Sequence, residues 1–375
     1  MTHVCVGRAA LALAMLTTAC AGTLPEEPHR SPEQRALSAL EREATRRAQL
    51  QQFSGVVLVW NDDGVLLERA WGVADRETAT AMTTGAKLRI GSLNKLFTSV
   101  ATLQLVEAGR LELDTPIGRY LSDYPNADVA ARVTLRHLLT HTGGTGDIFE
   151  PEYESRVRAA RDHADLLAIF GERGLAFEPG TMVAYSNYGF ILLGAIIERV
   201  TGRSYYDVVR EQIYEPASMA DTGSQPESEP VPGRVTGYTR PDNRELTFDP
   251  GAWRADDWRP TTDLLPYRGT AAGGGYTTAR DLRAFVAALG SGQLLPRAVF
   301  EQAIRLQPNA RAGLGFDVRE RWYGHGGGAP GMNAQLRMYF ESGIGLAILS
   351  NLDPPSADQL ADFFERSMIE HGARP

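Results

Sequence analysis

Apolar residues follow two patterns along this chain, and the patterns occupy different regions. The runs FSGVVLVW (53–60) and VLLERAWGV (65–73) flank the turn sequence NDDG and predict a β-hairpin near the start. A second strand pair is predicted near the end, where AQLRMYF and GLAILSN surround ESGIG. Strands at both ends with helices between them predict an α+β fold. We expect one antiparallel sheet built from both chain ends, flanked by helices, with a mostly helical insertion over about 81–265.

Helical spacing of apolar residues marks the regions between and around these strands. It predicts helices at about 31–51, 93–108, 134–140, 188–200, 279–289 and 356–371. Residues 223–275 are rich in Pro, Gly, Thr and Asp with little periodicity, which predicts a long irregular excursion. Long loops of this kind in a compact domain often carry functional residues. The aromatic residues in it either line a substrate pocket or pin the loop to the body: Trp253, Trp258 and Tyr267.

Composition narrows the class of protein. With 375 residues, 43% of them hydrophobic, the chain can bury a large core, and residues 32–375 read as one domain. The net charge is −8 and no concentrated basic face is evident, which argues against a nucleic-acid partner. The expected partner is a small-molecule or peptide substrate, and the sequence leaves the oligomeric state open.

The first 21 residues predict an export signal. Arg8 precedes the apolar stretch AALALAML, and the small residues Ala19-Cys20-Ala21 resemble a cleavage site. Cys20 is an alternative lipid-attachment point, through which alone the chain would contact a membrane. A Pro-rich linker follows at 22–31. We therefore expect an exported protein, periplasmic or secreted, whose mature body has no cysteine, because Cys5 and Cys20 are the two cysteines of the chain.

Lysine is rare in this chain, and one of the two lysines lies three residues after a serine. Of 38 basic residues, only Lys87 and Lys95 are lysines. The predicted helix begins at or just after Ser92, so Ser92 and Lys95 lie on one face and their side chains can meet. A serine hydroxyl becomes a good nucleophile when a neighbouring base takes its proton. Lysine can be that base if burial and the positive helix end lower its pKa, whereas arginine stays protonated.

A plainer interpretation exists for this motif, with Ser92 as a helix N-cap and Lys95 as a surface residue. Two further stretches of sequence favour a catalytic role for Ser92 and Lys95 over that interpretation. PGTMVAYSNYG places Tyr185 and Asn187 just before an apolar helix. RWYGHGGGAPG places His325 before three glycines and ahead of a strand, where a ligand can approach the backbone closely.

Together and in this order, the motifs resemble the serine β-lactamase and penicillin-binding-protein superfamily. The likeness runs from about Phe53 to Asn351 and is greatest to the class C-like branch with its D-Ala-D-Ala carboxypeptidases, D-aminopeptidases and esterases. It implies a serine hydrolase without cofactor or metal that works through an acyl-enzyme. The substrate, whether ester, D-amino-acyl amide, peptide or β-lactam, stays open.

The resemblance also implies a role for each motif residue. Ser92 is the acylated nucleophile, and Lys95 and Tyr185 share the proton transfers, with the formal base undecided between them. Asn187 is implied to hydrogen-bond the substrate amide or to position Lys95, and His325 and Gly327 are implied to bind substrate. The backbone N–H groups of Ser92 and Gly328 would form the oxyanion hole.

The third motif departs from the commonest family pattern, because His325 stands where β-lactamases carry lysine. A histidine is mostly neutral at pH 7, so a substrate carboxylate loses its cationic partner. We expect uncharged esters or amides to be hydrolysed better than β-lactams at pH 8. If His325 faces the cleft and is not held neutral by burial, anionic substrates should gain as pH falls to 5.5.

Two alternatives remain besides such a hydrolase. One is a non-catalytic sensor of the same fold that binds β-lactam or peptidoglycan, and the other is a true β-lactamase. A sensor would react once, whereas an enzyme would turn over repeatedly. His137 and His141 have metal-ligand spacing on a short predicted helix, but no third ligand accompanies them, and His141 can cap the helix instead.

Overall fold

The computed structural model describes residues 30–149, 154–240 and 258–375, together with Met1. The predicted export signal, nearly all of the linker and Trp253 lie outside these residues. Within the described part of the chain, no helix combines the length and apolar character needed to cross a membrane.

The central sheet is built from both chain ends, which confirms the prediction. Strand β1 (Gly55–Asn61) pairs antiparallel with β12 (Gly345–Ser350), and Val57 lies opposite Ile348. The order across the sheet is β2-β1-β12-β11-β10-β9, with every neighbouring pair antiparallel. The other four strands are β2 (Gly64–Trp71), β9 (Asp317–Val318), β10 (Trp322–Ala329) and β11 (Met332–Tyr339).

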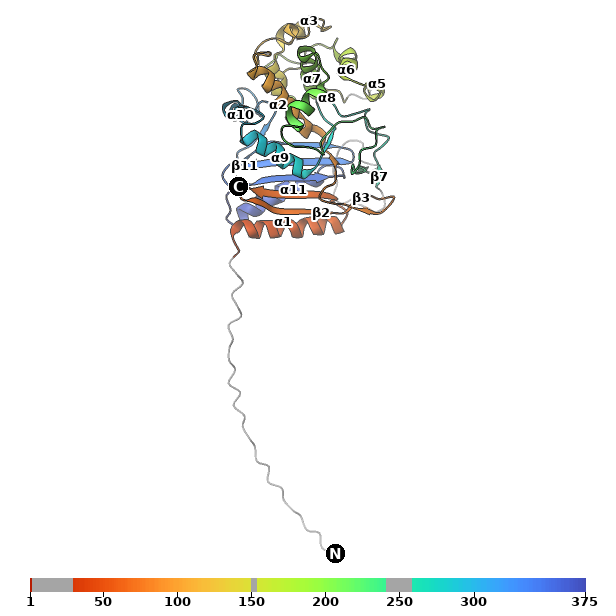
Figure 1. Cartoon of the computed structure of the whole chain (residues 1–375), viewed down its shortest axis with the longest axis vertical. Coiled ribbons are helices and arrows are strands. Elements are labelled where there is room, and N and C mark those ends of the chain that lie inside the picture. Colours follow the sequence, from red (N-terminus) through yellow and green to blue (C-terminus); the bar gives the residue numbers. More distant parts are fainter. Residues whose placement is uncertain (2–29, 150–153, 241–257) are drawn as a thin grey trace.

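One face of this sheet is covered by the terminal helices α1 (Pro32–Gln49) and α11 (Ser356–Glu370), as Figure 1 shows. Val57 and Val59 of β1 pack on this side with Leu40 and Phe364. Val56 and Leu58 point to the opposite side and join the larger core there. Because side chains alternate across a strand and both faces are covered, β1 reads as a continuous apolar run.

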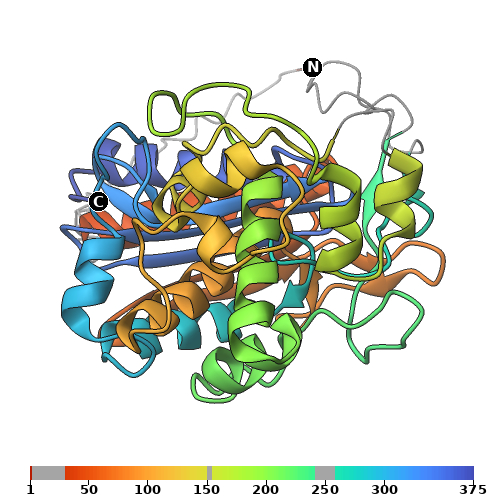
Figure 2. The ribbon, with the colours of Figure 1, turned by 90° about the horizontal axis from the view of Figure 1, so that it is seen from above.

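The remaining helices gather on the other face of the sheet and above it (Figures 1 and 2). Helix α9 (Ala279–Gly290) crosses the sheet, while helix α2 (Lys95–Glu107) runs upward from it. The other α-helices are α3 (Ala127–Arg132), α4 (Leu135–Leu139), α5 (Glu154–Ala159), α6 (His163–Phe170), α7 (Asn187–Thr201), α8 (Tyr205–Val209) and α10 (Arg297–Ala303). Short elements complete the fold: η1 (Gly91–Asn94), η2 (Ile117–Arg119), the π-turn η4 (Arg210–Tyr214), β3 (Val73–Asp75), β4 (Thr80–Ala81), β5 (Leu88–Arg89), β6 (Tyr238–Thr239), β7 (Arg259–Pro260) and β8 (Tyr276–Thr277).

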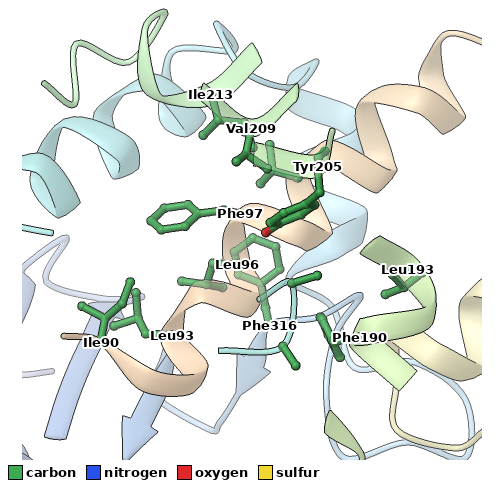
Figure 3. Packing of buried hydrophobic residues seen from close by; sticks show 14 of the residues in the cluster. Ile90, Leu93, Leu96, Phe97, Phe190, Leu193, Tyr205, Val209, Ile213 and Phe316 are labelled. Carbon is green, nitrogen blue, oxygen red and sulfur yellow. The ribbon is translucent and has the colours of Figure 1, made fainter. Parts of the chain in front are cut away.

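Helix α2 is buried on nearly all sides, and this burial fixes the position of its first turn. Leu96 and Phe97 pack into a cluster with Phe190 of α7 and Tyr205 of α8 (Figure 3). The ring of Phe97 meets those of Tyr214 and Phe285 edge to face. Such a densely packed helix holds the residues at its N-terminus rigidly, because side chains in a close-packed core have little room to move.

Candidate active site

Ser92 lies in a tight turn where the chain enters helix α2. Gly91 adopts φ +51°, a conformation that favours glycine, and the 3₁₀ turn η1 then leads into α2 at Lys95. Ser92 lies inside this turn, whose N-cap is Ile90. Its Oγ contacts Lys95 and Tyr185 instead of capping the helix. The N-cap interpretation of the motif is therefore excluded.

Lys95 is completely buried and has three hydrogen-bonding partners. Its Nζ lies 3.1 Å from Ser92 Oγ and 2.8 Å from Asn187 Oδ1, and it also donates to the backbone carbonyl of Ala272. The rings of Tyr185 and Phe190 lie 4.8 and 5.4 Å from Nζ. The spacing of three residues on a helix thus brings Ser92 and Lys95 together as predicted.

Burial changes the protonation of this lysine. It lowers the pKa of Lys95 to about 7, against the opposing effect of the negative charges of Asp147 and Asp317. Near neutral pH a large fraction of Lys95 is therefore an uncharged amine. An amine of this kind has a lone pair that can accept the proton of the Ser92 hydroxyl, which the second lysine of the chain, paired with Asp221, is not placed to do.

Tyr185 completes the contacts of the serine. Its hydroxyl donates a hydrogen bond of 2.7 Å to Ser92 Oγ. Although 48% of the residue is exposed, burial of the hydroxyl end raises the pKa of Tyr185 well above its usual range, and the hydrogen bond with Ser92 only partly offsets this. The phenol is therefore protonated at neutral pH, so it acts here as a donor.

His141 lies against Tyr185, and the sequence did not indicate this. Its ring centroid is 4.4 Å from that of Tyr185, and its Nδ1 accepts the backbone N–H of Ser186. Burial, followed by the charge of Lys95, lowers the pKa of His141 to about 3, so the imidazole is neutral. His141 therefore supports Tyr185 through a contact between tilted rings.

Asn187 begins helix α7 and joins the site through both ends of its amide. Its Oδ1 accepts from Lys95, and its Nδ2 donates to the carboxylate of Asp147 at 3.2 Å. Asp147 also accepts the backbone N–H of Asn187 at 3.0 Å. Nothing in the sequence patterns singled out Asp147, because its contact with Asn187 spans 40 residues of chain.

The third motif lies inside a strand of its own and not ahead of one, which corrects the placement expected from the residue pattern. His325 and the three glycines belong to β10, and Gly327 lies opposite Ala334 of β11. A Cβ on Gly327 would come within 1.9 Å of the Ile90 carbonyl oxygen, and one on Gly91 within 2.8 Å of the Gly328 nitrogen. The glycines thus let the backbone of β10 lie directly against the turn that carries Ser92.

His325 is buried, with 6% of its surface exposed. Burial lowers the pKa of His325, although the charge of Asp317 acts in the opposite direction. Burial therefore acts against the expected gain for anionic substrates at low pH, and the imidazole is mainly neutral at pH 7. Its Nδ1 lies against the backbone carbonyl of Gly326.

The irregular excursion supplies one wall of the site. Its segment Thr270–Gly273 runs beside η1, and its backbone accepts from Asn94, Thr98 and Lys95. The aromatic residues of the excursion that the structure describes lie against arginines. Arg76 and Arg240 contact the ring of Trp258, and Arg161 lies 4.2 Å from that of Tyr267. These contacts favour the pinning of the loop over a substrate pocket.

The two histidines with metal-ligand spacing have other partners. His137 Nδ1 accepts the backbone N–H of Thr134 in a capping box at the start of α4. His141 contacts the ring of Tyr185 and accepts the backbone N–H of Ser186. Across the described ranges, no group of three or more His, Cys, Asp or Glu side chains is arranged to hold a metal ion.

Comparisons with known proteins place this geometry in a family. A family model described as Beta-lactamase matches residues 39–367. Penicillin-binding protein 4 of Amycolatopsis lactamdurans is 29% identical over 79% of this chain and 80% of its own length. Esterase EstB of Burkholderia gladioli is 31% identical over 77% of this chain and 78% of its own length. The crystal structure of a penicillin-binding protein from Bacillus halodurans matches with a TM-score of 0.74 and 26% identity, covering 87% of this chain and 98% of that one.

The chain therefore belongs to the beta-lactamase family. It is an enzyme of the serine hydrolase kind, and the predicted β-lactamase-like fold is confirmed.

Proposed function

We propose that this chain is an exported hydrolase that cleaves small esters or amides through an acyl-enzyme on Ser92. The observation that carries the proposal is the position of a buried, partly neutral amine, Lys95 Nζ, 3.1 Å from Ser92 Oγ. A buried amine with a lowered pKa is a competent general base at neutral pH. Tyr185 stays protonated, so we assign the base to Lys95 and a proton-donor role to Tyr185.

In the proposed reaction, Lys95 takes the hydroxyl proton while Ser92 Oγ bonds to the carbonyl carbon of the substrate. The negative charge that develops on the carbonyl oxygen is held by the backbone N–H groups of Ser92 and Gly328. The bond to the alcohol or amine then breaks, and this leaving group takes the proton back through Lys95 and Tyr185. Water attacks the ester on Ser92 by the same proton path, releasing the acid and restoring the serine.

Exposed apolar side chains near Tyr185 and Asp147 in the sequence favour an uncharged, apolar substrate. The segment that carries Tyr185 also presents Met182 and Val183, exposed by 54% and 40%, and Phe149 follows the Asp147 segment with 74% exposure. The carboxylates of Asp147 and Asp317 act on Lys95, and their negative charges would repel an anionic substrate. His325, buried and neutral, offers a substrate carboxylate no positive charge. Short-chain esters therefore fit better than β-lactams.

Two measurements test the proposal. A fluorophosphonate probe should label the wild-type chain at one residue, and Ser92→Ala should abolish labelling. Hydrolysis of p-nitrophenyl butyrate should proceed over many turnovers. A single stoichiometric burst would instead identify a sensor, and turnover by Ser92→Ala equal to that of wild type would contradict the assignment of the nucleophile.

A further inference from the structure

A carboxylate outside the three motifs fixes the orientation of the Asn187 amide. One oxygen of Asp147 accepts the backbone N–H of Asn187 at 3.0 Å, and the other accepts Asn187 Nδ2 at 3.2 Å. An ionised carboxylate can only accept hydrogen bonds. The NH₂ end of the Asn187 amide must therefore face Asp147, which leaves Oδ1 to face Lys95 at 2.8 Å.

Asp147 is itself held firmly in place. Arg173 donates to the backbone carbonyls of Asp147, at 2.7 Å, and Thr145, at 3.4 Å. Ser186 Oγ donates to the carbonyl of Gly146, so the turn is tied to the start of α7. The carboxylate also lies at the N-terminus of this 15-residue helix, where a negative charge is favourable.

The orientation of Asn187 decides where the lone pair of Lys95 points. A neutral amine has two N–H groups and one lone pair. Asn187 Oδ1 and the Ala272 carbonyl are both acceptors and take the two N–H groups. The lone pair is left for the third partner, the hydroxyl of Ser92. If the Asn187 amide were reversed, its NH₂ would compete with Ser92 for that lone pair.

We propose that Asp147 is a positioning residue of the hydrolase, which locks the Asn187 amide so that neutral Lys95 directs its lone pair to Ser92. The inference rests on the proposed function and deepens it. Asp147 touches neither the serine nor the lysine through a hydrogen bond in the described residues, so it acts through Asn187.

The charged groups that face Lys95 provide a matched control. Asp147 and Asp317 both raise the pKa of Lys95, while neighbouring His141 and His325 have lowered pKa values and Tyr185 a raised one, so these three are neutral near pH 7. Asp317 lies on β9, 3.6 Å from Arg319. Removing its charge affects the same amine without disturbing the Asn187 amide.

The test compares pH profiles of kcat/KM for p-nitrophenyl butyrate in wild type, Asp147→Asn and Asp317→Asn. In both variants the acid limb should shift to lower pH, because a negative charge near Lys95 is lost. In Asp147→Asn the plateau should also fall by roughly 10- to 100-fold, part of what a general base contributes. In Asp317→Asn the plateau should stay within about twofold of wild type, because this change leaves the hydrogen bonds of the Asn187 amide to Lys95 and Asp147 in place.

A double variant that exchanges the two side chains keeps the test decisive if Asp147→Asn folds poorly. The double variant Asp147→Asn/Asn187→Asp restores a donor at 147 and an acceptor facing Lys95. It should regain most of the plateau, with an acid limb at higher pH than wild type because a carboxylate now adjoins the amine. Equal plateaus in Asp147→Asn and Asp317→Asn, or no rescue by the swap, would overturn the proposal. A wild-type chain that lacks Ser92-dependent turnover would instead refute the proposed function.

Discussion

The side-chain amide of Asn333 donates a hydrogen bond of 2.9 Å to the backbone carbonyl of Gly327. This carbonyl and the N–H of Gly328 belong to one planar trans peptide, so they point in opposite directions. Asn333 therefore helps to aim the Gly328 N–H away from β11 and toward the Ser92 turn. The Oδ1 of Asn333 accepts from the N–H groups of Ala357 and Asp358, which ties the strand to the start of α11.

We expect Asn333→Ala to lower kcat for p-nitrophenyl butyrate by roughly 10- to 100-fold, within the loss seen when an oxyanion donor is removed. It should also cost about 1 kcal/mol of stability, because the N-terminus of α11 loses a side-chain acceptor. Ser31→Ala is the control, since it removes the capping box of α1 far from the site. Steady-state kinetics and urea unfolding of both variants separate the effects. Full kcat in Asn333→Ala would exclude a role in aiming the peptide.

Lys95→Arg should reduce kcat/KM by about 10²–10⁴, the usual contribution of a general base, because arginine stays protonated. The lysine side chain is fully buried, so a permanent cation there should also lower the melting temperature. Lys95→Met, which carries no charge, controls for this effect and should be equally inactive. A circular dichroism melt accompanies the kinetics. Near wild-type turnover in either variant would show that Lys95 is not the general base.

The lowered pKa of Lys95 makes stability depend on pH. The unfolded chain keeps the proton up to about pH 10.5, whereas the folded chain releases it above about 7. The cost of burying the ammonium is therefore fully present below pH 7 and is relieved as pH rises from 7 to 10.5. Relative to Lys95→Met, the wild type should gain free energy of unfolding over this range, on the order of a few kcal/mol in total. Urea unfolding at pH 6.5, 8 and 9.5 measures the gap, and a constant gap would refute the lowered pKa.

The side chain at position 325 should determine the preference for anionic over neutral substrates. In the wild type, His325 is buried and its pKa is lowered, so the ratio of kcat/KM for p-nitrophenyl hemisuccinate over p-nitrophenyl butyrate should stay flat from pH 8 to 6.5. His325→Lys introduces a cation and should raise this ratio by about fivefold or more, since an opposite-charge pair about 4 Å apart is worth about 1 kcal/mol even in water. An unchanged ratio in the variant would mean that residue 325 does not face the substrate's charge.

Export predicts a shortened mature chain. The purified protein should begin near Ala21 or Gly22, or at a lipidated Cys20, because the apolar run ends there in small residues. Intact mass spectrometry of extracted protein gives the N-terminus directly. Leu13→Asp, which breaks the apolar run, is the control and should leave the chain full-length in the cytoplasm. Recovery of full-length wild type from the cytoplasm would contradict export.

Patterns within short segments allowed much of this protein to be anticipated. The alternation and the apolar runs of β1, β2, β11 and β12 gave the sheet from both ends, because a strand's two faces repeat every two residues. The pairing of Ser92 with Lys95 followed from helical spacing over three residues, which is a local property. By contrast, the residue pattern placed His325 ahead of a strand and not inside β10, because four glycines among the eight residues of β10 have low strand propensity and its pairing with neighbouring strands holds it extended.

The tertiary structure alone decided how the motif residues work. Burial of Lys95 by α2, α7 and the 270–273 segment sets its protonation, and no count of residues along the chain measures that burial. Asp147 and Asn333 form hydrogen bonds with residues that the motifs named, and the identity of such a neighbour depends on how the loops fold back. The sequence therefore determined the class of chemistry through residue types at short spacings. The long-range packing, which depends on contacts across many residues of chain, determined which lysine is neutral, which amide end faces it and where the peptide N–H points.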